Sequence, residues 1–201
     1  MRTLIARPMA VLPTAVALLA AGAGGQVAVL PGELEAWEQP GLPRNLTEAE
    51  RAYLREHPLV VPEFAGAPTG PVVCPGEYGP MDGVCFSYTQ FPGQVAQLAA
   101  WVTTDGNARA YVYVASAAAQ TSATTALTNA GANLSRVVFR QFQLNTVWIR
   151  DYGPRYIYEG PAGSQVRAII DHVYNRPRPL DDAMPDNFAL LKNHAAYDLP
   201  L

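Results

Sequence analysis

From about residue 71 onward, short runs of β-branched and aromatic residues alternate with longer helical stretches, and this alternation restricts the fold most. Strand patterns occur at residues 84–88, 110–115, 136–144, 155–158 and 166–173. Helix patterns occur at residues 94–102, at 116–130 and from about Asp186 through Leu191. The final residues, 197–201, resemble the approach to another strand. Strands and helices in alternation predict an α/β domain over residues 71–201.

Three helices carry further local signals. In the helix at 94–102, one face is predicted to be apolar and to consist of Val95, Leu98, Ala99 and Val102. Gly131 follows the helix at 116–130 as its C-terminal stop. Thr47 and Glu50 have the spacing of a capping box, which predicts a third helix at 48–56.

The first 23 residues are predicted to be a signal peptide. Arg2 and Arg7 supply a positive region, residues 9–21 are mostly apolar, and residues 21–23 form an Ala-Gly-Ala cleavage site. No later run approaches about 18 apolar residues, the length of a membrane span. We therefore expect export to the periplasm or the medium, without membrane contact after cleavage; an uncleaved anchor is the alternative. Residues 24–70, rich in proline and glycine, are expected to lead into the domain.

Composition excludes several classes of function. Apolar residues make up 49% of the chain and charged residues 15%, which favours a folded globular protein. The net charge of -3, without a cluster of Lys and Arg, argues against nucleic-acid partners. The sequence has no nucleotide-binding fingerprint and no zinc-ligand set, so we predict neither a cofactor nor a metal.

The two cysteines, Cys74 and Cys85, would enter an oxidising compartment on export. A disulfide between them is possible and would stabilise the chain by roughly 3 kcal/mol. Free structural cysteines are the alternative, because spacing alone does not establish geometry. Neither cysteine has a His or Arg nearby in sequence, so neither is predicted to be a nucleophile.

Two segments carry residues suited to ligand binding. In residues 145–154, Trp148, Arg150 and Asp151 precede a Gly-Pro turn at the end of a predicted strand. A carboxylate accepts two parallel hydrogen bonds from a guanidinium, and Trp148 could stack on that cation. Alternatively, Arg150 and Asp151 form structural ion pairs within the fold, and Trp148 fills the core.

In the second segment, prolines hold the chain extended around Arg176 and Arg178, so these side chains are expected to project to the same side. Two arginines placed in this way suit a carboxylate or a phosphate. The alternative is a solvated loop that carries two surface charges.

Together these segments resemble the bacterial peptidylarginine deiminase and agmatine deiminase family over roughly residues 75–201. The resemblance is carried by WxRDxGP at 148–154, by NRPR at 175–178 and by DDxxP at 181–185. It implies a pentein fold, in which ββαβ modules surround a pseudo-fivefold axis. The chain would supply about two of the five modules.

In that family, a cysteine thiolate attacks the guanidinium carbon, a histidine protonates the leaving ammonia, and water releases the ureido product. The resemblance implies that Asp151 is one of two carboxylates that hold the guanidinium. It further implies that the substrate is bound by Trp148, Arg150, Arg176 and Arg178. The second carboxylate, the histidine and the cysteine have no counterpart, so we expect an inactive, truncated fragment. The three histidines are expected to be structural or exposed: His57, His172 and His194.

The NRPR segment resembles the peptidylarginine type, whose two arginines contact the terminal carboxylate of the substrate. Agmatine has no carboxylate, and export also favours peptides. We therefore expect a hydrolase that converts peptidyl arginine, especially C-terminal arginine, to citrulline and ammonia. One alternative is agmatine deiminase, an enzyme of putrescine synthesis. The other is a non-catalytic exported module that binds arginine peptides. The sequence does not specify the oligomeric state.

Overall fold

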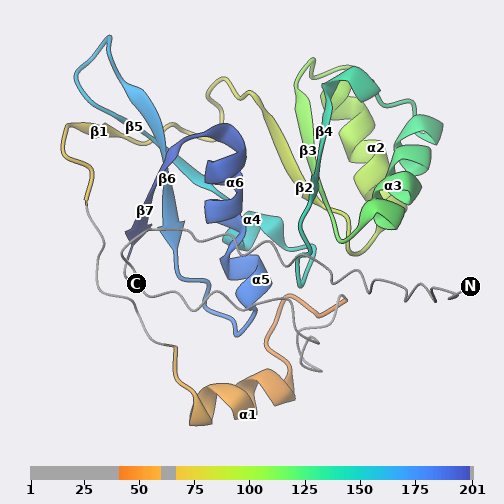
Figure 1. Cartoon of the computed structure of the whole chain (residues 1–201), viewed down its shortest axis with the longest axis horizontal. Coiled ribbons are helices and arrows are strands. Elements are labelled where there is room, and N and C mark those ends of the chain that lie inside the picture. The colour runs from red at the N-terminus through yellow and green to blue at the C-terminus, as the bar shows by residue number, and fades with distance from the viewer. Residues whose placement is uncertain (1–40, 60–66, 200–201) are drawn as a thin grey trace, which may run out of the picture.

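The structure, a computed structural model, describes residues 41–59 and 67–199 (Figure 1). The predicted signal peptide, residues 1–23, lies outside the described residues, as does part of the predicted lead-in. Two α/β units lie side by side in Figure 1, and helix α1 (Glu48–Glu56) lies below them in that view. None of the helices within the described ranges is long and apolar enough to cross a membrane.

The first unit is a parallel three-stranded sheet covered on one face by two helices. Its strands lie in the order β2 (Gly83–Ser87), β3 (Arg109–Val114) and β4 (Val137–Gln141). The crossovers are α2 (Pro92–Thr103) and α3 (Ala117–Asn129), the latter followed by the 3-10 helix η2 (Leu134–Arg136). Parallel neighbours require such crossovers because a hairpin joins only antiparallel strands. Both helices lie on the same side of the sheet (Figure 1).

Strand β3 is buried on both faces. Ala110, Val112 and Val114 pack into a core with residues of α2 and α3. Tyr111 and Tyr113 point the opposite way, into a second core shared with the other unit. Because successive side chains of a strand alternate between its faces, one strand contributes to both cores. These tyrosines therefore connect the two units.

The local helix signals are confirmed, except for one predicted face. Helix α3 begins after Ser116, whose side chain accepts a hydrogen bond from the first turn, and Gly131 follows its end at φ +83°. The predicted face of α2 was wrong at Leu98, which is 47% exposed. Ala96 and Ala100 are buried instead. Helix α2 packs against the sheet and α3 together, so its buried face is rotated toward these small residues.

The second unit is a four-stranded mixed sheet in the order β1 (Val72–Val73), β5 (Arg155–Glu159), β6 (Val166–His172) and β7 (Ala195–Leu199). Strands β5 and β6 form an antiparallel hairpin. Helices α5 (Pro179–Asp182) and α6 (Met184–Lys192) return the chain so that β7 runs parallel to β6. This unit has the ββαβ order of the expected module, whereas the first has the order βαβαβ. The predicted α/β class is confirmed, and β7 is the strand expected near residue 197.

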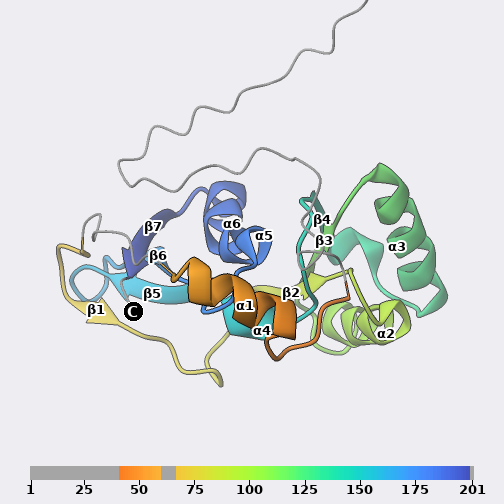
Figure 2. The ribbon, with the colours of Figure 1, turned by 90° about the horizontal axis from the view of Figure 1, so that it is seen from below.

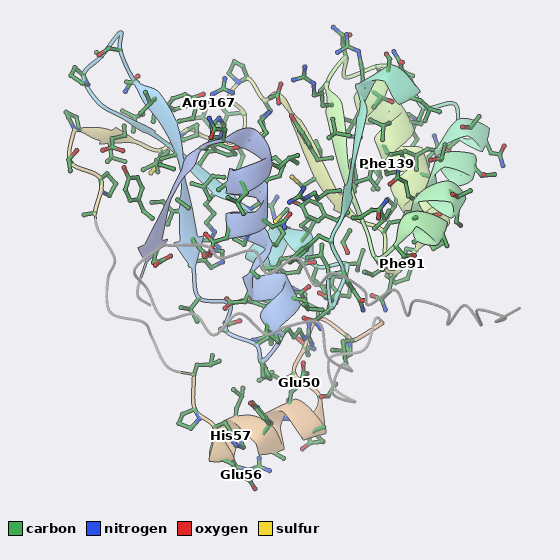
Figure 3. All side chains as sticks on the ribbon, viewed as in Figure 1. Glu50, Glu56, His57, Phe91, Phe139 and Arg167 are labelled. Carbon is green, nitrogen blue, oxygen red and sulfur yellow. The ribbon has the colours of Figure 1, made fainter. Side chains whose placement is uncertain are left out.

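Helix α1 has the predicted bounds and the predicted capping box. The backbone N–H of Glu50 donates to Thr47 Oγ1 at 3.2 Å, and the backbone N–H of Thr47 donates to Glu50 Oε2 at 2.6 Å. Glu50 lies on the side of α1 that faces α5, and Glu56 lies on the opposite side (Figure 3). The Glu50 side chain is fully buried, so it attaches α1 to the rest of the molecule.

Candidate functional site

The predicted guanidinium-binding motif lies between β4 and β5. Strand β4 is shorter than predicted, and the chain continues through the buried residues Leu144 and Asn145 into the short helix α4 (Ile149–Tyr152). Asp181 accepts hydrogen bonds from the backbone N–H groups of Asn145 (2.8 Å) and Thr146 (3.1 Å). Burial raises the pKa of Asp181 to about 7, against the lowering effect of these bonds. Asp181 therefore fixes residues 145–146 relative to the segment that carries the two arginines.

Gly153 ends α4 at a close backbone approach. Its N–H donates to the Ile149 carbonyl at 2.6 Å. A Cβ atom added at Gly153 would lie 2.5 Å from that same carbonyl oxygen, closer than such atoms can pack. The glycine of the motif is therefore required by the tight turn that follows Asp151.

Asp151 binds a guanidinium group within the chain itself. Arg44 Nε lies 2.9 Å from Asp151 Oδ2, and Arg44 Nη2 lies 3.3 Å from Oδ1. The side chain of Asp151 is 26% exposed and that of Arg44 is 66% exposed, so the pair lies at the surface. His172 Nε2 donates to the backbone carbonyl of Asp151 at 3.1 Å, which holds α4 against β6. The carboxylate of Asp151 is thus positioned to accept two hydrogen bonds from a guanidinium.

Three other predicted residues contact the backbone around Arg44. Trp148 Nε1 donates to the carbonyl of Leu42 at 3.1 Å. Arg176 Nε donates to the carbonyl of Arg44 at 3.4 Å. Arg178 Nη2 donates to the carbonyls of residues 43 and 45, at 2.6 and 3.4 Å. The site residues therefore surround residues 42–45, which we call the arginine segment; α1, which follows it, projects over α4 in Figure 2.

Arg178 differs from the expectation that it stands beside Arg176 to bind a substrate carboxylate. Its side chain is fully buried, and it already binds the carboxylate of Glu50, with Nε 2.7 Å from Oε1 and Nη2 3.3 Å from Oε2. Burial alone would raise the pKa of Glu50, but hydrogen bonds from Arg178 and Thr47 hold it below its ordinary value. The two arginines reach the same segment, but only Arg176 is partly exposed.

Arg150 does not line the site. Its Nη2 lies 2.6 Å from Oε1 of Glu77, and both side chains are about four-fifths exposed, at 81% and 80%. The substrate-binding role that the resemblance implied for Arg150 therefore has no support in the geometry. The alternative that Arg150 and Asp151 pair within the fold agrees with the geometry, because Arg150 pairs with Glu77 and Asp151 pairs with Arg44.

Comparisons with known proteins show a likeness of fold to solved structures. No family model and no curated protein matches the chain. Among solved structures, it is similar to an X-ray structure described as a "putative agmatine deiminase", at 14% sequence identity and a TM-score of 0.48. The match covers 63% of this chain and 39% of that one, so this chain spans about two fifths of that protein's length. A likeness at this level assigns no residue role here.

The cysteines are both free thiols, so the possible disulfide is not formed. Cys74 is exposed at the end of β1. Cys85 lies partly buried in β2, where burial raises its thiol pKa to about 12. A thiol with so high a pKa is protonated at neutral pH and is a poor nucleophile. The expectation that Cys85 is not catalytic agrees with this environment.

The histidines occupy structural positions. His57 is exposed, and its ring stacks on Tyr53 with centroids 4.4 Å apart. His194 Nδ1 lies 3.0 Å from the hydroxyl of Tyr156. His172 supports the backbone of Asp151 through its Nε2.

The lead-in contributes contacts that sequence analysis missed. Arg44 and Glu50 provide the partners of Asp151 and Arg178, across 107 and 128 residues of chain respectively. The available signal was a lone arginine in a Pro-rich segment directly before a capping box. That signal gives the position of Arg44 but not its partner.

Proposed function

We propose that this chain is the substrate-binding part of a deiminase-type amidine hydrolase that acts on arginine within peptides. One observation carries the proposal: Asp151 holds the guanidinium of Arg44, while neighbouring residues bind the backbone on both sides of that arginine. The arginine segment stands in for an arginine-containing peptide. Its guanidinium represents the group that the complete enzyme would convert to a ureido group, with release of ammonia.

The backbone contacts favour a peptide over agmatine. Trp148, Arg176 and Arg178 donate to carbonyl oxygens from residue 42 through residue 45. Agmatine offers a guanidinium but no peptide carbonyls, so it would forgo all of these bonds. Hydrogen bonds that involve a charged group contribute about 1.5–3 kcal/mol each. Predicted export supports the same substrate class.

The proposed substrate carries its arginine inside a peptide chain, whereas the sequence favoured a C-terminal arginine. Arg44 has peptide bonds on both sides, and Arg178 lies buried against Glu50 rather than open to a terminal carboxylate. The proposed ligand is therefore an extended segment with an internal arginine. Turnover would additionally require a cysteine thiolate and a histidine in the family's catalytic positions.

A second candidate function is a non-catalytic module that binds arginine peptides. It is favoured by the environments of the two thiols. Burial keeps Cys85 protonated, and Cys74 is exposed directly after β1. In both functions the binding step is the same. They differ in whether any citrulline forms.

The test compares three ligands by isothermal titration calorimetry. One is an acetylated, amidated Leu-Pro-Arg-Asn peptide with the sequence of residues 42–45; the second replaces its arginine with citrulline; the third is agmatine. We expect the arginine peptide to bind at least tenfold more tightly than the neutral citrulline peptide, and more tightly than agmatine. Asp151→Asn should remove the discrimination between arginine and citrulline.

Equal binding of the arginine and citrulline peptides, both to the unmodified chain and to a variant with Arg44→Ala, would refute a guanidinium site at Asp151, because Arg44 occupies that carboxylate in the unmodified chain. Tighter binding of agmatine would refute the peptide assignment and favour the free amine. Mass spectrometry of the peptide after incubation separates the two candidate functions, because citrulline formation would exclude the non-catalytic module.

A further inference from the structure

Three aspartates from different elements of the second unit converge outside the arginine site. Asp171 lies in β6, Asp186 in the first turn of α6, and Asp198 in β7. One carboxylate oxygen from each lies within 4.8 Å of the others. We propose that these three carboxylates bind a divalent cation with oxygen ligands, namely Ca²⁺.

The topology of the ββαβ unit produces this convergence. Asp171 and Asp198 are register partners on the neighbouring parallel strands β6 and β7, so their side chains lie on the same face of the sheet. Helix α6 packs against both strands, as Figure 1 shows, and brings Asp186 to that face. A cation at this position would connect three elements of the unit, β6, α6 and β7.

A second observation indicates that a ligand is missing from this group. Asp171 is only 4% exposed, and its Oδ2 is buried without a hydrogen-bond partner in the described part of the chain. Burying an ionised carboxylate without a partner costs several kcal/mol. A cation between the three side chains would provide the partner that Oδ2 lacks.

Other carboxylates of the described residues have a cationic partner, which Asp171 lacks. Glu50 pairs with Arg178, Asp151 with Arg44, and Asp82 with both Arg109 and Lys192. Across residues 41–59 and 67–199, no Lys, Arg or His forms an ion pair with any of the three converging aspartates. Their mutual repulsion is therefore not compensated by a protein cation.

The donor set selects the class of cation. All three donors are carboxylate oxygens, which suit hard cations such as Ca²⁺ and Mg²⁺ rather than metals that prefer sulfur or imidazole. Because the three oxygens lie within 4.8 Å of one another, a Ca²⁺ ion about 2.4 Å from each can contact all three, and its flexible coordination does not require the octahedral geometry that Mg²⁺ needs. Asp186 and Asp198 are partly exposed, so water can complete the coordination.

The test measures Ca²⁺ binding to the chelator-treated chain by calorimetry and by thermal denaturation with and without CaCl₂. We expect one site with a Kd between about 10 µM and 1 mM, a Ca²⁺-dependent rise in Tm, and weaker binding of MgCl₂. Asp186→Asn should weaken Ca²⁺ binding at least tenfold. The same variant should raise Tm in the absence of Ca²⁺, because it relieves repulsion.

Asp105→Asn is the matched control, since it removes one exposed carboxylate from the loop after α2 and should leave the Ca²⁺ response unchanged. Asp198→Asn provides a second variant from another element and should reproduce the effect of Asp186→Asn. The proposal is overturned if Ca²⁺ at millimolar concentration does not bind, or if both variants bind it as tightly as the unmodified chain.

Discussion

The guanidinium of Arg44 lies against the carboxylate of Asp151, with Nε 2.9 Å from Oδ2 and Nη2 3.3 Å from Oδ1. Two N–H···O bonds of this kind match the fork of a guanidinium to the two oxygens of a carboxylate. An arginine from outside the chain would need the same two oxygens. The lead-in therefore competes with the ligand that we propose for the site.

Arg44→Ala should strengthen the binding of the Leu-Pro-Arg-Asn peptide by at least about fivefold, because the competing side chain is gone. The measurement is peptide titration, with Arg51→Ala as the control. Arg51 is exposed in α1 and, within the part of the chain that the structure describes, pairs with Glu48 of its own helix, so its removal should leave peptide affinity unchanged. Weaker binding to Arg44→Ala than to the unmodified chain would show that Arg44 supports the site instead of occupying it.

Glu50→Ala should destabilise the chain strongly, because it leaves the buried guanidinium of Arg178 without its carboxylate. Removal of one partner of a buried ion pair costs about 3–5 kcal/mol. The double variant Glu50→Leu with Arg178→Met should lose less than the sum of the single variants. Urea unfolding of all four chains gives the coupling; additive losses would contradict a direct pair.

The contribution of His172 to stability should fall as the pH is lowered through its titration range. Burial, with a smaller contribution from Arg155, lowers the pKa of His172 below its ordinary 6.5, against the effect of the bond to the Asp151 carbonyl. Above about pH 6.5 both folded and unfolded states hold a neutral imidazole. Below it the unfolded chain takes up a proton that the folded chain resists, so the free energy of unfolding decreases.

His172→Gln should remove part of this decrease, as measured by urea unfolding between pH 8 and pH 5. His194, whose pKa burial also lowers, leaves the remaining part in place. An unchanged pH dependence in His172→Gln would mean that its imidazole titrates alike in both states.

Gly153→Ala should destabilise the chain by about 1–3 kcal/mol, because the added Cβ overlaps the Ile149 carbonyl. The resulting shift of α4 should also weaken arginine-peptide binding at Asp151. Gly93→Ala is the matched control: it lies in α2, a Cβ there meets nothing within 4 Å, and helix propensity predicts a gain of up to about 1 kcal/mol. Equal effects of the two substitutions would exclude the proposed close approach.

The two thiols should react at different rates with a thiol reagent such as iodoacetamide. Cys74 is exposed and should react in the folded chain, whereas Cys85 should react only after unfolding, because burial keeps it protonated. Mass spectrometry of peptides from labelled chains identifies each site. Protection of both cysteines, reversed by a reductant, would instead demonstrate the disulfide.

Local sequence determined the limits of α1 and α3 but gave no signal for the short elements β1, α4 and α5. Thr47 and Glu50 specify where α1 begins, and Ser116 and Gly131 bound α3, because capping involves only neighbouring residues. Alternating strand and helix patterns likewise determined the α/β class. The predicted buried face of α2 was wrong at Leu98, since contact with both the sheet and α3 decides which residues are buried.

Tertiary structure alone decided the partners of the charged residues. The sequence predicted that Asp151 and Arg178 bind the substrate, but it did not show their partners in the fold, which lie 107 and 128 residues away. It also gave no sign that Asp171, Asp186 and Asp198 meet, because their spacing fits no metal-binding motif. Ion pairs and ligand sites depend on distances in space, and these become fixed only when elements distant in the sequence pack together, as β6, α6 and β7 do around the three aspartates.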